Sequence, residues 1–536
     1  MKPLLTSNLK VTFLGITPVL NDKTGVLNSQ EIVALSALLS FKGKAIKTLF
    51  KEIKEKGENL DDRIKLILGK SSLRGHASLS TTPSLCLTCE GSKFLDSALT
   101  GIVFSSSLTT SGRRSKTTEK DIVYPSQIFQ NKKAKKTYQE VSERIIQFFN
   151  FLLDQKIKKD EASKILQYGI YGTLIIQLPV ESIIGLKREY EAEKEWMPEE
   201  IGILLKKIEK EAKNFGIDLL YATREAAPRH IYPYPNIFKN PAKSNLVREM
   251  RKKEKLRGSS KLISMDIYIP SELKKQLISL AKKTKKTFSS LKQIKKDWPN
   301  ILYWRREILR DYNLALRFKV LSSVPWRVWG EKKRHRTVPQ IIESIYYCTE
   351  RARKQFAKFK KPIETKKINN RLVKEIEKVF SLPPSIKRDK ALLSEYLLVA
   401  LEAFKGYYKL LKLGIKSREA IFLIPRGVKI DVLQDYDLYN LLTGYYPLRL
   451  CQTAEEEMRS NTLKEVDQIK KALNKKGYGW LNKFIGPKCE TAGFCPEEKS
   501  CGHIKKVVRE YSEKFHQEMQ KDLEKKFQDN FKNLKG

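Results

Sequence analysis

The chain has 536 residues, a hydrophobic content of 41% and a formal net charge of +43. The length exceeds one ordinary core and predicts two or three domains. The charge favours partners that carry phosphate, including nucleotides and nucleic acids, although a general lysine bias explains it equally well. The longest apolar runs fall far short of the ~20 residues of a membrane span. Seven cysteines fit a reduced, cytoplasmic protein better than a disulfide scaffold.

The first part of the chain alternates strand-like and helical patterns. Val11–Ile16 is a short, broken apolar run that predicts a strand rather than a secretory signal. Leu85–Cys89 alternates in the same way, so Cys86 and Cys89 should face opposite sides of a strand. Buried structural cysteines are therefore expected there, rather than a redox pair. A turn region rich in Ser and Thr follows at 103–117.

An internal repeat organises the chain. The pattern Leu-Leu-x3-Ile-Lys-x2-Glu-Ala occurs at 152–162 and again at 410–420, an offset of 258 positions (410 minus 152). Each copy ends a helical segment and precedes a β-prone run, Ile170–Leu178 in the first copy and Ile421–Pro425 in the second. We favour duplication over the coincidence of a short motif.

The second half predicts one strand and several long helices. The strand is Leu316–Val324, and the charged stretch Arg248–Arg257 before it is helical or loose. Helices are predicted at Glu343–Lys358, Leu392–Leu413 and Thr453–Leu473. A last single helix is predicted over 503–534, with apolar residues at helical spacing.

The triplet Arg334-His335-Arg336 is the strongest local signal. Arg presents a rigid fork of donors that fits phosphate in a bidentate way. A His between two Arg can stay neutral, because nearby positive charge disfavours its protonated form. The triplet suits a diphosphate or an electron-rich ring, but by itself it is more often ordinary basic surface in a chain with 104 Lys and Arg residues.

Two segments each carry half of a longer signature. Flavin-dependent thymidylate synthases (the ThyX family) have Arg-His-Arg-x2-Ser-x4-Ser-x-Arg, and the chain resembles this pattern twice. The copy at 101–113 keeps Ser106, Ser111 and Arg113 but has Gly101-Ile102-Val103 in place of the triplet. The copy at 334–346 keeps the triplet and the second Ser, and it lacks the first Ser and the final Arg.

Three further segments are similar to the same family. Arg74–Leu79 resembles its Gly-His-x-Ser/Thr segment, and Arg449–Arg459 resembles its late Arg-bearing helix. The stretch 486–502 resembles the Cys-bearing tail of some archaeal members.

The resemblance implies an α+β fold with two tandem ThyX-like copies, each an antiparallel sheet with long helices. Copy one would be 1–240, with the Ser-x4-Ser-x-Arg half of the signature. Copy two would be 241–485, with the Arg-His-Arg half. The Cys loop and C-terminal helix would occupy 486–536.

The resemblance also implies reductive methylation of dUMP to dTMP. Methylenetetrahydrofolate would donate the carbon and NADPH would be the reductant, with FAD between them. Two alternatives stay open. One is flavin-dependent methylation of another pyrimidine. The other is an inactive family member that binds nucleic acid, for which Trp304, Arg305, Arg306, Trp326, Arg327 and Trp329 interleave aromatic and cationic side chains.

The resemblance assigns roles to individual residues. FAD would be bound by His76, Ser78, Arg334, His335 and Arg336. The substrate dUMP would be bound by Ser111, Gly112, Arg113 and Arg449. The catalytic group would be Ser111, Arg113 and His335. Family active sites form between the subunits of a homotetramer, so copy one would supply the nucleotide face and copy two the flavin face. A homodimer of this chain would then be a pseudo-tetramer.

The C-terminal cysteines allow two interpretations. Cys489, Cys495 and Cys501 with His503 could form a tetrahedral zinc set. Their spacing is not that of a usual Cys-x2-Cys finger, so we prefer a reduced loop packed on the last helix and predict no metal.

Overall fold

The computed structural model describes residues 3–22, 25–110, 117–228, 235–243, 245–256, 259–301 and 306–535. These residues form two compact units. Unit 1 comprises 1–245, 325–336 and 342–430, and unit 2 comprises 246–324, 337–341 and 431–536. None of the helices in the described part of the chain is long and apolar enough to span a membrane. The division into 1–240, 241–485 and 486–536 concerns sequence repeats rather than packing, and it stays a prediction.

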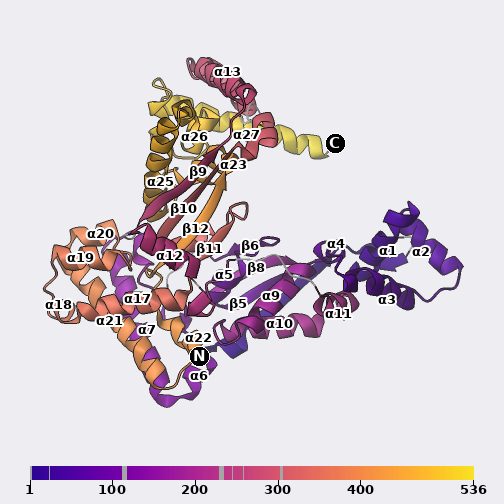
Figure 1. Cartoon of the computed structure of the whole chain (residues 1–536), viewed down its shortest axis with the longest axis horizontal. Coiled ribbons are helices and arrows are strands. Elements are labelled where there is room, and N and C mark those ends of the chain that lie inside the picture. The colour runs from indigo at the N-terminus through magenta and orange to yellow at the C-terminus, as the bar shows by residue number, and fades with distance from the viewer. Residues whose placement is uncertain are drawn as a thin grey trace. The chain divides into compact units, whose positions relative to one another are not determined.

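A four-stranded antiparallel sheet forms the frame of unit 1. Its strands are β2 (Lys10–Thr17), β5 (Ser84–Ser92), β8 (Tyr171–Pro179) and β6 (Ser106–Thr109), in that order across the sheet. The helices α9 (Val180–Ala192) and α10 (Glu199–Glu211) run along it (Figure 1). The strand predicted at 11–16 is confirmed, and so is the prediction that Cys89 is buried, while Cys86 is half-buried.

Unit 2 contains most of a second four-stranded sheet. The strands are β11 (Gln340–Ile342), β12 (Lys429–Asp437), β10 (Leu316–Pro325) and β9 (Ser260–Ile267), in that order. In chain order, both sheets follow one scheme: the first strand pairs with the second, the second with the fourth, and the fourth with the third.

The β-prone run predicted at Ile421–Pro425 is not a strand. Residues Ile421–Leu423 form a 3₁₀ turn that is fully buried, and the strand β12 begins only at Lys429. A short apolar run does not distinguish a buried strand from a buried turn, which is why the pattern misled the prediction.

Two 23-residue helices occupy equivalent places in the chain. They are α7 (Lys132–Asp154) and α21 (Lys390–Lys412), and side-chain caps from Asn131 and Asp389 begin them. Their first residues lie 258 positions apart (390 minus 132). The same offset relates the nine-residue strands β8 and β12, and the short helices α8 (Lys159–Ala162) and α22 (Ser417–Ala420).

The helices α7 and α21 pack against each other in antiparallel fashion within unit 1. Tyr396 lies beside Phe148, with ring centroids 6.3 Å apart, whereas the later Gly406 lies against the earlier Val141. Between these contacts, Arg144 Nε lies 3.4 Å from Glu402 Oε2. Arg144 and Glu402 are separated by 258 positions, the offset of the repeat. The residue of α7 at the contact is therefore equivalent to the residue of α21 that it meets.

The segments after α8 and α22 meet in the same way. Gln167 forms a bridge with Pro425, and the guanidinium carbon of Arg426 lies 4.9 Å from the ring centre of Tyr168. Each pair again joins positions 258 apart. The ring of Phe94 stacks on Phe422 at 4.0 Å and builds the buried aromatic core beside these contacts.

The other helix predictions had mixed outcomes. Helices α17 (Ile345–Lys358) and α25 (Glu456–Lys475) are present as predicted. The single helix predicted over 503–534 is wrong, because a 3₁₀ turn at His503–Lys506 precedes α27 (Glu513–Lys535). The hydroxyl of Ser512 accepts the Phe515 N–H at 3.1 Å and caps a new helix there.

Candidate functional site

The Arg-His-Arg triplet lies in a turn directly after helix α16 (Trp326–Lys332) of unit 1. Trp326 and Trp329 are fully buried and anchor this helix, and the indole Nε1 of Trp326 donates to Ser97 Oγ at 3.1 Å. The end of α16, and with it the turn, is therefore held in one place. Large buried aromatic side chains provide much of the packing energy of a core.

The turn brings both arginines to strand β6. Arg334 Nη2 donates to Thr109 Oγ1 at 2.7 Å, and Arg336 Nη2 lies 3.4 Å from Ser107 Oγ. Side chains alternate along a strand, so Ser107 and Thr109 share the half-buried face of β6 while Leu108 is exposed. The two halves of the split signature are thus neighbours in unit 1.

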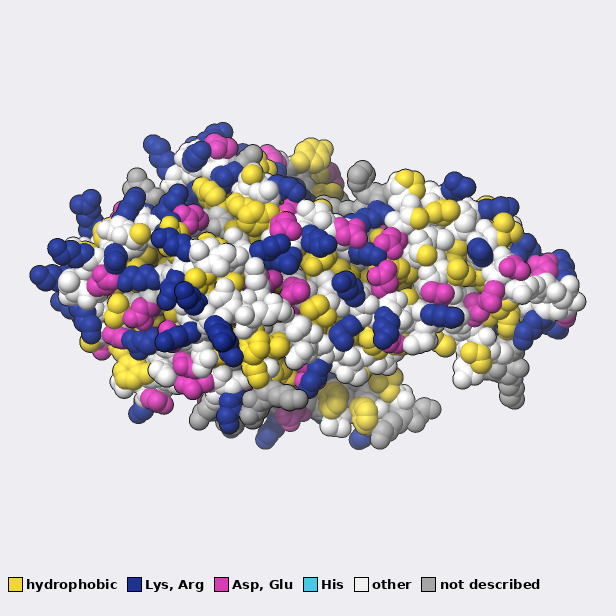
Figure 2. All heavy atoms as spheres, turned by 90° about the horizontal axis from the view of Figure 1, so that it is seen from below, with side chains coloured by type: hydrophobic (Ala, Val, Ile, Leu, Met, Phe, Trp, Pro, Cys, Tyr) yellow, Lys and Arg dark blue, Asp and Glu magenta, His cyan; other side chains and the backbone are white. Residues whose placement is uncertain are grey.

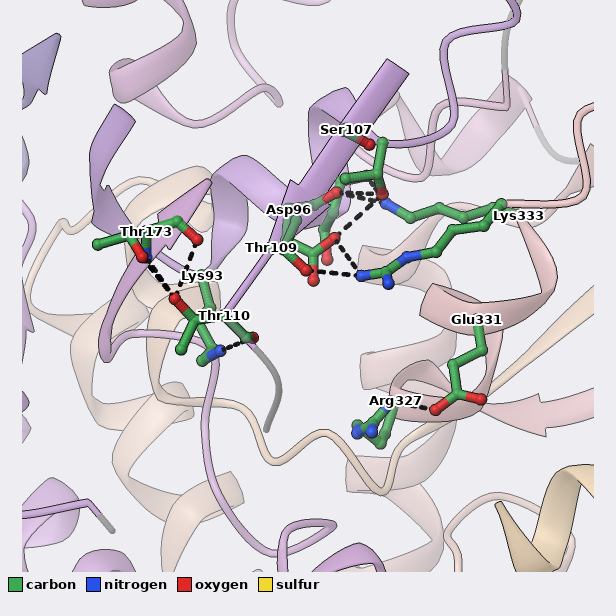
Figure 3. A network of polar contacts seen from close by, with 12 residues as sticks. Lys93, Asp96, Ser107, Thr109, Thr110, Thr173, Arg327, Glu331 and Lys333 are labelled. Atoms are coloured by element: carbon green, nitrogen blue, oxygen red, sulfur yellow. Dashed lines mark hydrogen bonds and ion pairs between the residues drawn. The ribbon is translucent and has the colours of Figure 1, made fainter. Parts of the chain in front are cut away.

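Lys333 fixes the turn from inside. Its amine is buried and donates to the carbonyl oxygens of Asp96 at 2.5 Å and Ser97 at 2.7 Å (Figure 3). Burial lowers the pKa of Lys333 to about 7, against the opposing effect of Asp96. Burial also opposes ionisation of Asp96, yet Lys333, Arg334 and Lys93 hold its pKa below the usual value.

Lys93 forms the second buried anchor. Its amine donates to the carbonyl oxygen of Thr110 at 2.9 Å, and the hydroxyl of Thr110 pairs with that of Thr173 (Figure 3). Burial and the charge of Arg426 lower the pKa of Lys93 to about 7. The contact fixes the residue that immediately precedes Ser111, Gly112 and Arg113, which lie outside the described residues.

The site carries more positive than negative charge. Lys93, Lys333 and Arg334 surround the carboxylate of Asp96, and Arg336 faces Lys333. The Nε of Arg336 is buried and has no hydrogen-bond partner in the described part of the chain. Burial and Arg334 lower the pKa of the Arg336 guanidinium. A polyanion such as a diphosphate would offset this excess charge and supply the missing acceptor.

Backbone register equates the two halves of the signature. Lys93 N donates to Ile170 O, and Trp326 N donates to Val428 O, while 170 and 428 are related by the 258-residue offset. Lys93 and Trp326 therefore occupy equivalent positions. Residues 101–103 and 334–336 begin at the same distance after them and are equivalent as well. The same residues are equivalent when the two signature halves, 101–113 and 334–346, are aligned by sequence.

His76 and Ser78 lie elsewhere in unit 1, on the wall of a cavity of about 700 Å³. The helices α1 (Ser29–Lys42) and α3 (Leu60–Lys70) provide most of its apolar lining. Both side chains are exposed to this space. Gly75, with φ of +102°, lets the backbone turn directly before His76.

Two groups of predicted residues belong to unit 2. Arg449 ends the short helix α24 (Tyr445–Arg449) and is half-buried. In the C-terminal loop, Cys489 and Cys495 pack against Phe515 of α27, as the preferred interpretation of a loop packed on the last helix requires. His503 Nε2 contacts Glu490 Oε1 at 2.5 Å. Among the described residues, no three Cys, His, Asp or Glu side chains are placed to hold a metal ion.

Sequence reasoning missed four residues that build the site: Lys93, Asp96, Ser107 and Thr109. Two signals were available. Ser107 and Thr109 alternate inside the signature half at 101–113. Lys93 and Asp96 follow β5, the second strand of its sheet, and the triplet follows β10, the second strand of the other sheet. Neither signal identifies which side chains meet, because that depends on the pairing of β6 with β8.

Comparison with known proteins shows which family the second half of the chain is similar to. The family model described as "Thymidylate synthase complementing protein" matches residues 315–473. A flavin-dependent thymidylate synthase of Pyrococcus abyssi is 31% identical over 125 residues, which are 23% of this chain and 50% of the relative. One of Saccharolobus solfataricus is 28% identical over 155 residues, 28% of this chain and 55% of the relative.

Residues 315–473 of the chain are therefore similar to flavin-dependent thymidylate synthases (the ThyX family). It spans about half the length of the curated relatives that it matches. Among solved structures, a UMP/dUMP methylase of Streptomyces cacaoi bound with 5-Br dUMP has 13% identity and a TM-score of 0.32, covering 43% of this chain and 100% of that one. ThyX of Helicobacter pylori with FAD and dUMP has 15% identity and a TM-score of 0.28, covering 40% and 99%.

Proposed function

We propose that the chain is a flavin-dependent thymidylate synthase that methylates dUMP to dTMP. The proposal depends mainly on one observation: Arg334 and Arg336 from one half of the family signature contact Thr109 and Ser107 from the other half. Neither half is complete in sequence. Their adjacency within unit 1 supports a single composite site.

The donor set fits FAD. Its diphosphate needs forked cationic donors, and Arg334 and Arg336 offer two guanidinium groups, of which the buried Arg336 Nε has no acceptor among the described residues. When bound, FAD would supply the hydride chemistry of the reduction, with NADPH and methylenetetrahydrofolate as co-substrates. His335 would orient the flavin, and His76 and Ser78 would contact it from the cavity wall.

The remaining groups of the site would hold the nucleotide and keep the site in shape. Ser111, Gly112 and Arg113 would bind dUMP, with Arg113 neutralising its phosphate. Lys93 would hold the start of this segment through the carbonyl of Thr110, and Lys333 would hold the triplet through the carbonyls of Asp96 and Ser97. The role of Arg449 as a dUMP contact stays a prediction, and so does a cytoplasmic location.

We further propose that the chain arose by tandem duplication of a ThyX-like domain. The common strand scheme of the two sheets supports this proposal, as do the helices, strands and contacts repeated at an offset of 258 residues. Two chains would then assemble into a pseudo-tetramer. Light scattering should report a particle with twice the 62.1 kDa mass of the chain, and a monodisperse monomer would contradict this assembly.

The proposed activity is tested by the visible absorption spectrum of the purified protein before and after dUMP is added. A bound-flavin spectrum that shifts with dUMP, and dTMP formation with NADPH and methylenetetrahydrofolate, are expected. Arg113→Ala and Arg336→Ala should each abolish dTMP formation, whereas Lys51→Ala, which changes an exposed helical lysine, should not. Full activity in either arginine variant would contradict the composite site.

Two other outcomes correspond to the alternative functions. Bound flavin without a dUMP response would indicate a different pyrimidine acceptor. A colourless protein that does not take up FAD but binds single-stranded nucleic acid in a salt-dependent way would indicate the binding function. In the view of Figure 2, Lys and Arg side chains are interspersed with Asp and Glu rather than gathered in one patch.

A further inference from the structure

A buried ion pair connects three segments of unit 1. Arg224, on α11 (Asp218–Ala226), is fully buried and donates from Nε and Nη2 to the two carboxylate oxygens of Glu181, both at 2.8 Å. Glu181 lies in the first turn of α9 and is almost fully buried. This bidentate geometry is the strong form of an Arg–carboxylate pair.

The pair also binds both ends of the segment that carries His76 and Ser78. Arg224 Nη1 donates to the carbonyl oxygen of Ser72 at 3.2 Å, before the segment. Ser80 Oγ donates to Glu181 Oε2 at 2.6 Å, after it. The residues between these two anchors turn outward at Gly75 and line the cavity.

The same turn of α9 reaches toward the arginine site. Ser182, the neighbour of Glu181, donates from Oγ to the carbonyl oxygen of Phe104 at 3.3 Å. Phe104 lies two residues before Ser106, where the strand β6 that contacts Arg334 and Arg336 begins. The first turn of α9 therefore contacts the end of the His76–Ser78 segment and the residues that lead into the strand contacted by the two arginines.

We propose that the Glu181–Arg224 pair is a positioning device that fixes the His76–Ser78 segment on the cavity wall in the geometry needed for ligand binding. The charged groups of the pair bond to Ser72 and Ser80, which flank the segment, so the pair acts through these two residues. A ligand that contacts His76 and Ser78 would bind a segment already ordered, which lowers the entropy lost on binding. The identity of that ligand as FAD depends on the proposed function.

Removing either charged partner would leave a buried, unpaired charge and could unfold the protein. Ser80→Ala is the sharper variant, because it detaches one end of the segment and leaves the ion pair intact. Ser80→Thr restores the hydroxyl. Thr81→Val is the matched control, since the Thr81 hydroxyl donates to the carbonyl oxygen of Ser78 within the same helical turn.

Two readouts on the full-length protein separate positioning from general stability. Hydrogen exchange of the amides at 72–79 should accelerate in Ser80→Ala, with the exchange of α3 and the thermal midpoint unchanged. The dissociation constant for FAD, followed by flavin fluorescence, should rise about fivefold, as expected for one hydrogen bond. Ser80→Thr should recover both values.

The outcomes are distinguishable. Exchange at 72–79 that is the same in Ser80→Ala as in the wild type overturns the positioning role, whatever FAD does. Exchange that accelerates in Ser80→Ala but equally in Thr81→Val also overturns it. If only Ser80→Ala accelerates exchange and the wild type takes up no FAD, the positioning role is supported and the proposed flavin function fails.

Discussion

Arg334 donates to Thr109 across 225 residues of sequence, at 2.7 Å. The contact joins the two incomplete halves of the signature inside one compact unit. A change at Thr109 tests whether the strand β6 positions the arginine.

Thr109→Val removes the acceptor and keeps the shape and strand preference of the side chain. We expect FAD or dUMP affinity to fall about fivefold, because a partly exposed charge-assisted hydrogen bond contributes on the order of 1 kcal/mol. Titration by flavin fluorescence measures the loss. Leu108→Thr, on the exposed face of the same strand, is the control, and an equal loss in this variant would rule out a specific role for Thr109.

Burial of Lys333 predicts a dependence of stability on pH. Its pKa is about 7 in the folded protein and about 10.4 in an unfolded chain. Between these values the unfolded state binds more protons, so the free energy of unfolding should rise as pH rises through this window. Asp96, Arg334 and Arg336 are the charged groups that face the amine.

Lys333→Met should remove this contribution. From pH 7 to pH 9, the wild type should gain on the order of 2 kcal/mol relative to the variant. Urea unfolding of both proteins at the two pH values measures the difference. Parallel changes in the two proteins would show that Lys333 does not titrate in this range.

Two equivalent glycines predict matched losses of stability. A Cβ at Gly169 would lie 2.7 Å from Phe422 O and would also collide with the Tyr138 hydroxyl. A Cβ at Gly427 would lie 3.0 Å from Lys164 O. Gly169→Ala and Gly427→Ala should each destabilise the protein by about 1–3 kcal/mol, as overpacking does.

Gly330→Ala is the control for these glycine variants. Its Cβ would meet only Tyr168 Oη, at 3.8 Å, and the residue lies inside the helix α16. This variant should be neutral or slightly stabilising, since Ala favours a helix over Gly. Thermal unfolding compares the three variants, and equal effects in all of them would contradict the packing argument.

Charge reversal tests the crossing of α7 and α21. Arg144 pairs with both Glu395 and Glu402, so Arg144→Glu places three carboxylates together. The pair is partly exposed, and we expect a loss of about 1 kcal/mol. Glu402→Arg added to Arg144→Glu should restore part of it. Denaturant unfolding of the single and double variants gives the coupling, and strictly additive effects would mean that the pair does not interact.

The sequence predicted the features that depend on residues close together in the chain. The repeat, the triplet and the strands near 11–16, 170–178 and 316–324 could be recognised from short patterns. The composite site could not be assembled from patterns, because Lys93, Asp96 and Thr109 meet the triplet only through strand register and helix packing. The strand predicted at 421–425 is wrong because a buried turn has the same apolar pattern. The helix predicted over 503–534 is wrong because the Ser512 cap starts a new helix.

The contact between Arg144 and Glu402 also bears on how such a chain can evolve. In a symmetric pair of identical subunits, a residue at the crossing point would face its own copy, so Arg would meet Arg and Glu would meet Glu. Opposite charges at a self-facing position require two different sequences. If the two halves arose by the proposed duplication, this pair would favour contact between the halves over contact of either half with its own copy. As such complementary pairs accumulate, separation of the halves would yield an obligate heterodimer rather than two independent homodimers.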